Sequence, residues 1–154
     1  MTARILVVDD IEANLRVLEA KLTAEYYDVI SASDGPTALA MAASEHPDIV
    51  LLDVMMPGMD GFEVCRRLKE DPITRHIPVV LVTALDGRAD RIAGLEAGAD
   101  EFLNKPIDDV MLFSRVRSLT RLKTVIDELR QREASGRRIG VIAGMECAGL
   151  RICG

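Results

Sequence analysis

Five short runs of apolar residues are spaced along the chain between residues 5 and 103. They are Ile5–Val8, Val29–Ala32, Ile49–Leu52, Val79–Val82 and Glu101–Leu103, the second being the weakest and the fifth the shortest. The clearer runs are continuous rather than alternating, which is typical of strands that are covered on both faces, as in parallel sheets. The pattern therefore predicts five buried β-strands.

The stretches between these runs carry apolar residues at helical spacing, which predicts amphipathic helices. Asp34 before a Gly-Pro pair and Asp60 before a glycine are typical helix starts, and Gly98 is typical of a helix end. The apolar positions at helical spacing are Ile11, Leu15, Leu18 and Leu22; Phe62, Cys65 and Leu68; Ile92 and Leu95; and Leu112, Val116 and Leu119.

Five repeats of a strand followed by a helix define the fold class. Right-handed crossovers between parallel strands place helices on both faces of a single sheet. We therefore predict an α/β fold of the flavodoxin-like type, a (βα)5 doubly wound parallel sheet with strand order 2-1-3-4-5.

The last predicted helix extends beyond the end of this domain. Helix-compatible sequence continues past Leu122 and Leu129 with apolar spacings of three and four, but without a strict heptad. Two interpretations stay open: a surface helix with a frayed end, or a helical linker that carries a signal or pairs with a second copy. We expect a domain over residues 1–122, a helical extension over residues 123–135, and a flexible tail or truncated linker over residues 136–154.

Composition limits the partners that the chain can have. Hydrophobic residues make up 49% and aromatic residues only 3%, so the core must be aliphatic. The net charge of −6 opposes contact with phosphate backbones, and we expect no direct nucleic-acid binding. One late basic cluster is interleaved with acidic residues and lacks aromatics for base stacking. Its members are Arg115, Arg117, Arg121, Lys123, Arg130, Arg132, Arg137 and Arg138.

No signal peptide and no stretch long enough to span a membrane are evident, so we expect a cytoplasmic chain without a membrane partner. The three cysteines, Cys65, Cys147 and Cys153, are odd in number and widely spaced, and Cys147 and Cys153 have no partnering pair of histidines. Free thiols are therefore the better interpretation than a zinc site.

Reactive side chains stand at four of the predicted strand ends. Asp9 and Asp10 end the first strand, Asp53 the third and Thr83 the fourth, and Lys105 follows the fifth. Each alone has an ordinary interpretation as a helix cap, a turn residue or a surface lysine. In the predicted strand order, however, these four strands are neighbours, and ligands bind at the carboxyl ends of parallel strands. The five side chains are therefore expected to converge.

Three carboxylates this close repel one another unless a cation intervenes. Mg²⁺ suits the position, because it takes carboxylate and carbonyl oxygens and keeps several waters. The amine of Lys105 supplies further positive charge. This set of groups indicates phosphoryl transfer to Asp53, with Thr83 donating a hydrogen bond to a phosphoryl oxygen.

These segments resemble the response-regulator receiver (CheY-like) family. The matching segments are ILVVDD at residues 5–10, DIVLLDVMMPGMDG at residues 48–61, VTA at residues 82–84 and FLNKP at residues 102–106. The resemblance covers roughly residues 3 to 122, and none of the motif positions departs from the family pattern.

The resemblance implies a role for each matching residue of the acidic site. Asp53 would accept a phosphoryl group from a histidine kinase or a phosphotransfer protein. Asp10 would bind Mg²⁺ directly, Asp9 would bind it through water, and Met55 would contribute its backbone carbonyl. Lys105 would pair with the phosphoryl group.

The resemblance also implies a conformational switch. Thr83 would be the switch hydroxyl and Phe102 the switch aromatic, which rotates inward when Thr83 moves. This motion would remodel the face made by the fourth helix, the fifth strand and the fifth helix, and would favour a homodimer or another partner. Because Phe102 has no hydroxyl, the switch would depend on packing alone. A cis peptide bond before Pro106 is also expected.

With its extension over residues 126–138, the chain resembles the N-terminal part of PleD-type regulators. Those proteins continue with a second receiver-like module and a diguanylate cyclase domain. The chain has no Gly-Gly-Asp/Glu-Glu-Phe motif. The resemblance therefore implies a signalling domain rather than an enzyme, and any cyclase activity would belong to a longer parent.

Two other functions stay open from the residues. One is a degenerate receiver that signals by docking without phosphorylation, and the intact acidic site argues against it. The other is a Mg²⁺-dependent phosphatase with an aspartyl nucleophile. Such enzymes usually have a second acid two residues after the nucleophile, where this chain has Met55.

Overall fold

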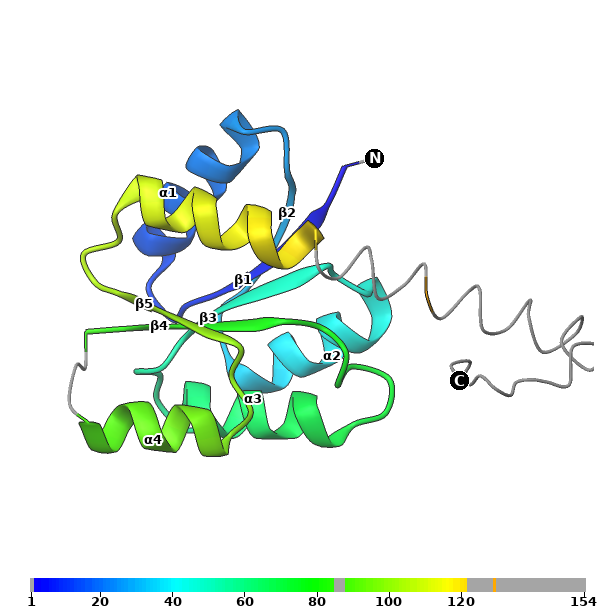
Figure 1. The fold of residues 1–154 in the computed structure, drawn as a ribbon, viewed down its shortest axis with the longest axis vertical. Coiled ribbons are helices and arrows are strands. Elements are labelled where there is room, and N and C mark those ends of the chain that lie inside the picture. The colour runs from blue at the N-terminus through cyan, green and yellow to red at the C-terminus, as the bar shows by residue number, and fades with distance from the viewer. Residues whose placement is uncertain (1, 85–87, 122–128, 130–154) are drawn as a thin grey trace, which may run out of the picture. The chain divides into compact units, whose positions relative to one another are not determined.

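Five parallel strands form one sheet in this computed structural model, which describes residues 2–84, 88–121 and 129. The strand order is β2-β1-β3-β4-β5, which confirms the predicted topology (Figure 1). The strands are β1 (Arg4–Val8), β2 (Asp28–Ala32), β3 (Ile49–Asp53), β4 (Val79–Thr83) and β5 (Glu101–Asn104).

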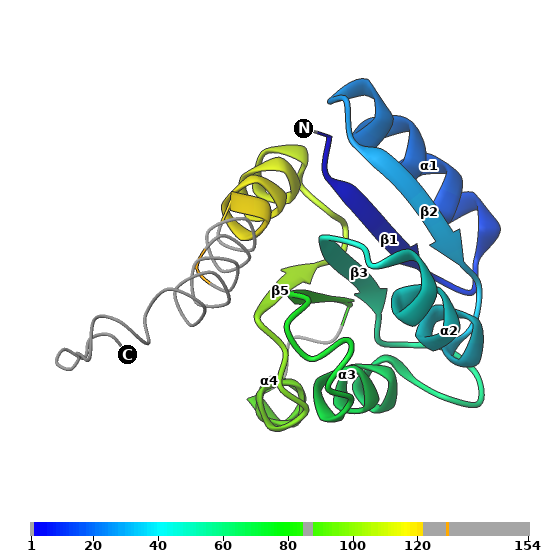
Figure 2. The same ribbon diagram turned by 90° about the vertical axis from the view of Figure 1, so that its right-hand side faces the viewer.

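Helices cover both faces of the sheet. They are α1 (Glu12–Ala24), α2 (Gly35–Glu45), α3 (Gly61–Glu70) and α4 (Arg88–Glu96), and a fifth helix begins at residue 109 and continues through residue 120. The views in Figure 1 and Figure 2 place α1 and the fifth helix on one face, and α2, α3 and α4 on the other. Within the described part of the chain, no helix combines the length and apolar character needed to cross a membrane.

The chain divides into two units, residues 1–120 and residues 121–154. The first contains the whole sheet. The second lies outside the described residues except for Arg121 and Leu129. The helical extension predicted over residues 123–135 and the tail predicted over residues 136–154 therefore stay predictions.

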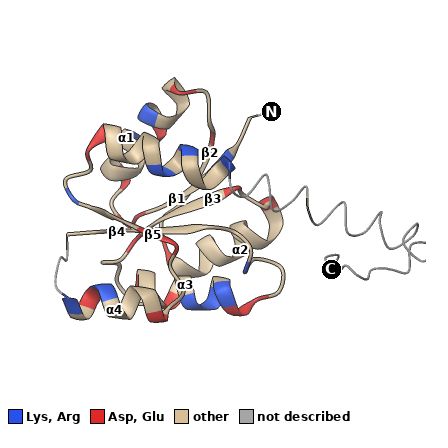
Figure 3. Ribbon diagram, viewed as in Figure 1, with Lys and Arg blue, Asp and Glu red and all other residues tan. Residues whose placement is uncertain are grey.

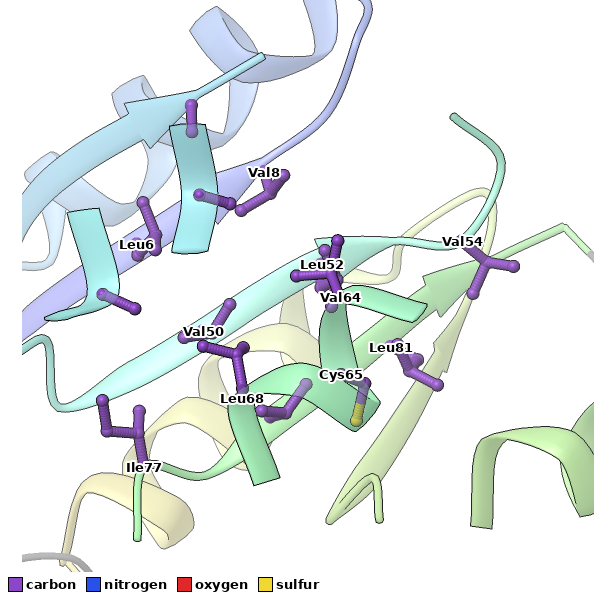
Figure 4. Packing of buried hydrophobic residues seen from close by; sticks show 14 of the residues in the cluster. Leu6, Val8, Val50, Leu52, Val54, Val64, Cys65, Leu68, Ile77 and Leu81 are labelled. Carbon is purple, nitrogen blue, oxygen red and sulfur yellow. The ribbon is translucent and has the colours of Figure 1, made fainter. Parts of the chain in front are cut away.

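The core has one apolar layer on each face of the sheet. Side chains alternate between the faces along a strand, so a continuous apolar run fills both layers. One layer lies between the sheet and helices α2 and α3, and its members include Leu6, Leu52, Val64 and Leu68 (Figure 4). The other layer is formed by Ile5, Val7, Leu15, Leu18, Leu22, Ile49, Leu51, Val80, Val82, Leu103, Leu112, Val116 and Leu119.

The predicted helix starts are confirmed by their capping hydrogen bonds. The Asp34 side chain accepts a hydrogen bond of 2.8 Å from the backbone N–H of Thr37, and Asp60 accepts one of 2.9 Å from that of Glu63. Both bonds satisfy N–H groups that have no partner inside the first helical turn. Gly98 follows α4 with φ +94°, the left-handed conformation expected of a helix end.

Three of the apolar residues at helical spacing are not part of the core. Ile11 precedes α1 and is 52% exposed, and Ile92 and Leu95 of α4 are 46% and 64% exposed. In α4 the buried residue is Gly94. A Cβ atom there would lie 2.5 Å from Cε1 of Phe102, so the aromatic ring takes the place of a side chain from the helix.

Among the cysteines, Cys65 is free and buried, as expected. Burial raises the pKa of its thiol to about 11. Cys147 and Cys153 lie outside the described residues. The interpretation of free thiols is thus confirmed only for Cys65. With a raised pKa this thiol stays protonated at neutral pH, and the protonated form is a poor nucleophile.

The Lys69 side chain on α3 binds polar groups near the starts of β4 and β5. Its Nζ atom donates hydrogen bonds of 2.8 Å to the carbonyl of Ile77 and 3.3 Å to that of Arg75, and it lies 2.8 Å from Oδ2 of Asp100. That Asp100 oxygen also accepts a hydrogen bond of 2.8 Å from the backbone N–H of Val79. One ammonium group therefore satisfies several polar groups at the end of the sheet opposite Asp53.

We expect the substitution Lys69→Met to lower the free energy of unfolding by about 1–2 kcal/mol, because it leaves partly buried acceptors without their donor. Urea denaturation measures this change. The control is Arg66→Met, which removes an exposed pair with Glu63 on α3, a helix that carries both signs of charge (Figure 3). Exposed pairs contribute little, so the control should change stability by less than about 0.5 kcal/mol. Equal losses of unfolding free energy in the two variants would contradict the stabilising role of the Lys69 hydrogen bonds.

Candidate functional site

Four of the predicted site residues lie at one edge of the sheet. Asp53 is the last residue of β3 and Thr83 the last residue of β4, and they are 3% and 5% exposed. Asp9 directly follows β1 and is 3% exposed. Lys105 directly follows β5, and its backbone N–H donates a hydrogen bond of 2.9 Å to the carbonyl of Thr83. Parallel strands bring these ends together, as predicted.

The three acidic residues form a compact group of oxygen ligands. One carboxylate oxygen from each of Asp9, Asp10 and Asp53 lies within 4.8 Å of the others. Asp9 and Asp53 are buried, whereas Asp10 is exposed. A set that offers only oxygen and opens to solvent on one side fits Mg²⁺, which binds a few carboxylates and keeps water ligands.

Lys105 stands between the two buried carboxylates. Its Nζ atom lies 3.0 Å from Oδ1 of Asp53 and 3.8 Å from Oδ2 of Asp9. Oδ1 of Asp53 is buried and accepts no well-aligned hydrogen bond from the described residues, so the ammonium group contacts it chiefly as a charge. The peptide bond between Lys105 and Pro106 is cis, as the resemblance implied.

Burial raises the pKa of Asp53 above its ordinary value, and the negative charges of Asp9 and Asp10 raise it further. The ammonium group of Lys105 opposes this shift, but it does not outweigh the desolvation of the carboxylate. The ionised form of Asp53 is therefore electrostatically strained without an added cation.

The two predicted switch residues line the same small hollow. This hollow of about 10 Å³ lies between Thr83 and Phe102, with Val54 and Phe62 among its walls. The ring of Phe102 packs against Gly94 of α4, and the guanidinium carbon of Arg91 lies 5.5 Å from the ring centroid. The space beside Thr83 holds at most one water, so it has no room for the ring in this arrangement.

Met55 lies in the loop after β3, and its side chain is 60% exposed. The predicted role of its backbone carbonyl as a metal ligand stays a prediction. A larger hollow of about 280 Å³ also adjoins the acidic residues. It lies between α1 and the segment after β5, and residues such as Leu18 and Ile107 line it.

Sequence reasoning missed two residues that shape the site. Asn14 on α1 donates a hydrogen bond of 3.1 Å to Oδ2 of Asp9. Gly61 begins α3, where a Cβ atom would lie 2.4 Å from the carbonyl oxygen of Asp53 and 2.7 Å from Cα of Val54. The signal for Asn14 was a polar residue in the first turn of a helix that directly follows two site acids. The signal for Gly61 was a glycine at the first position of α3.

The sequence also matches a known family model. The model of the response regulator receiver domain matches residues 5–117. The chain therefore belongs to the response-regulator receiver family.

Two curated relatives illustrate the range of similarity. The chain is 82% identical over 144 residues to the response regulator PleD of Caulobacter vibrioides, covering 94% of this chain and 32% of that protein. It is 39% identical over 139 residues to the alkaline phosphatase synthesis transcriptional regulatory protein PhoP of Bacillus subtilis, covering 88% and 57% respectively. The chain thus spans about a third of the length of PleD.

Solved structures share the fold. A response regulator from Chloroflexus aurantiacus superimposes with a TM-score of 0.75 at 34% identity, covering 79% of this chain and 99% of that one. The receiver domain of a sensor histidine kinase from Pseudomonas aeruginosa does so with a TM-score of 0.70 at 31% identity, covering 80% and 99%. The latter contains a magnesium ion coordinated in its active site cleft.

We expect Asp53→Asn to raise the free energy of unfolding at neutral pH, because the amide is neutral and removes the cost of burying a charge. A carboxyl group whose pKa is raised by folding opposes folding once it ionises. This increase in the free energy of unfolding should reach its full size at pH values above the folded-state pKa of Asp53. It should shrink as the pH falls and the carboxyl becomes protonated in both states. Urea denaturation across this pH range, without divalent cations, measures the difference. A gain that grows toward acid pH would contradict the assignment of a raised pKa.

Proposed function

We propose that Asp53 accepts a phosphoryl group from a phosphohistidine of a histidine kinase or a phosphotransfer protein. The observation that supports this most strongly is the buried Asp53 carboxylate, with two further acids and the Lys105 ammonium around it. A carboxylate oxygen of Asp53 attacks phosphorus in line, the bond between phosphorus and the histidine nitrogen breaks, and the imidazole leaves with the electron pair.

Asp9, Asp10, Asp53 and the backbone carbonyl of Met55 would hold Mg²⁺ at this site. When bound, Mg²⁺ supplies positive charge that offsets the three carboxylates and the phosphoryl oxygens. The Lys105 ammonium pairs with a phosphoryl oxygen and orients the group. The buried walls around Asp53 restrict access of water to the acyl phosphate.

Phosphorylation then shifts a two-state equilibrium. The Thr83 hydroxyl moves toward the phosphoryl group and widens the hollow that it shares with Phe102. The ring leaves Gly94 and enters the vacated space. This repacking changes the surface made by α4, β5 and the fifth helix, where Ile92 and Leu95 are exposed apolar residues suited to a protein contact. We propose that this surface forms a homodimer or binds a partner in the phosphorylated state.

We further propose that residues 1–122 are the receiver of a longer regulator. The similarity to PleD, of which this chain covers 32%, supports this proposal. Residues 123–135 would act as the helical connection, and residues 136–154 would lead toward the next module. A diguanylate cyclase output would belong to that longer protein.

The acceptor assignment is tested by incubating the chain with acetyl phosphate and Mg²⁺ and recording the intact mass. The native chain should gain one phosphoryl group, and Asp53→Asn should gain none, because its amide is not a nucleophile for phosphorus. The control Asp28→Asn changes an exposed aspartate at the start of β2 and should be phosphorylated normally. Labelling of Asp53→Asn would contradict the proposal. Steady turnover of a generic phosphoester by the native chain would instead favour a phosphatase.

The switch is tested by measuring the mass in solution with and without beryllofluoride and Mg²⁺. We expect a shift toward the dimer with beryllofluoride, and Leu95→Asp should abolish it by placing a charge in an apolar contact. The control Ile73→Asp alters a similarly exposed residue outside the proposed surface and should still dimerise. A chain that stays monomeric under all conditions would contradict homodimerisation by this domain, and a partner protein would then be the target.

A further inference from the structure

Both carboxylate oxygens of Asp9 already have hydrogen-bond donors at the start of α1. Oδ1 accepts a hydrogen bond of 2.9 Å from the backbone N–H of Ile11, and Oδ2 accepts one of 3.1 Å from the side-chain amide of Asn14. The Lys105 ammonium lies 3.8 Å from the same Oδ2 atom, beyond ordinary hydrogen-bond distance.

Asp53, by contrast, lacks such donors at its Oδ1 atom within the described part of the chain. Its buried Oδ1 atom accepts no well-aligned hydrogen bond from the described residues, and the Lys105 ammonium lies 3.0 Å from it. Two buried carboxylates therefore compete for one cation. In a medium of low dielectric, a cation lies closest to the carboxylate that is least satisfied by other donors.

We propose that Asn14 is a positioning residue that acts on Lys105 through Asp9. By donating to Oδ2 of Asp9, the Asn14 amide satisfies an acceptor that would otherwise compete with Asp53 for the Lys105 ammonium. The ammonium group consequently stays beside Asp53, where the incoming phosphoryl oxygens need it. This inference rests on the proposed function for its purpose, but the competition for Lys105 exists whether or not Asp53 is phosphorylated.

The surroundings of Asn14 allow this role to be separated from folding. The side chain borders the 280 Å³ hollow beside the acidic residues, with Val17 and Leu18 on the same helix. Asn14→Leu has nearly the same shape, removes only the amide, and places an apolar group against apolar walls. The variant is therefore expected to fold, which thermal unfolding checks.

The first test compares crystal structures of the native chain and Asn14→Leu, both without divalent cations. In Asn14→Leu, Nζ of Lys105 should lie closer to Oδ2 of Asp9 than to Oδ1 of Asp53, the reverse of the native arrangement. A Lys105 ammonium that remains nearest Asp53 would overturn the inference. This result does not depend on phosphorylation, so it decides the role of Asn14 even if the proposed function fails.

The second test measures the affinity for beryllofluoride with Mg²⁺ by fluorine NMR. Asn14→Leu should weaken binding about tenfold, the scale of one hydrogen bond to a charged group. In a Lys105→Met background the same substitution should change the affinity by less than about twofold, because the group through which Asn14 acts is gone. The control Val17→Leu should bind like the native chain.

An equal loss in both backgrounds would show that Asn14 acts on Asp9 alone, which would also overturn the inference. Failure of the native chain to bind beryllofluoride would contradict the proposed function instead. The crystallographic comparison would still decide whether Asn14 directs Lys105.

Discussion

Mutual repulsion among three carboxylates at the edge of the sheet is the constraint on which the site depends. Ligand oxygens of Asp9, Asp10 and Asp53 lie within 4.8 Å of one another, and two of the three residues are buried. One ammonium group, that of Lys105, does not balance three negative charges. The three carboxylates therefore repel one another in this structure, and a bound divalent cation would relieve that repulsion.

The fold imposes this closeness through strand geometry. Parallel strands that are buried on both faces end at one edge, so residues from distant parts of the sequence meet without a dedicated loop scaffold. Close packing holds them there, since Gly61 lets α3 start against the backbone of Asp53. At the opposite end of the sheet, Lys69 links α3 to the starts of β4 and β5. Close packing on both sides of the sheet thus fixes the positions of the two buried acids, Asp9 and Asp53.

The strands, their order and the convergence of the acids with Thr83 and Lys105 could all be predicted from the sequence. They follow from continuous apolar runs and from residues placed directly at the strand ends. The buried face of α4 could not be predicted in this way. Ile92 and Leu95 follow helical spacing, but it is Gly94 that lies against the Phe102 ring. Asn14 was missed for a related reason: its partner Asp9 lies in the segment before α1, and periodicity within a helix does not reveal such contacts.

We propose above all that Asp9, Asp10 and Asp53 form one divalent-cation site. Anomalous diffraction from crystals soaked in Mn²⁺, a substitute for Mg²⁺ with a strong anomalous signal, tests it most directly. A single strong peak should lie among these three carboxylates, about 2.2 Å from a carboxylate oxygen of Asp10 and one of Asp53. No peak there, or a stronger one at the exposed acids near Glu45 and Asp48, would contradict the claim.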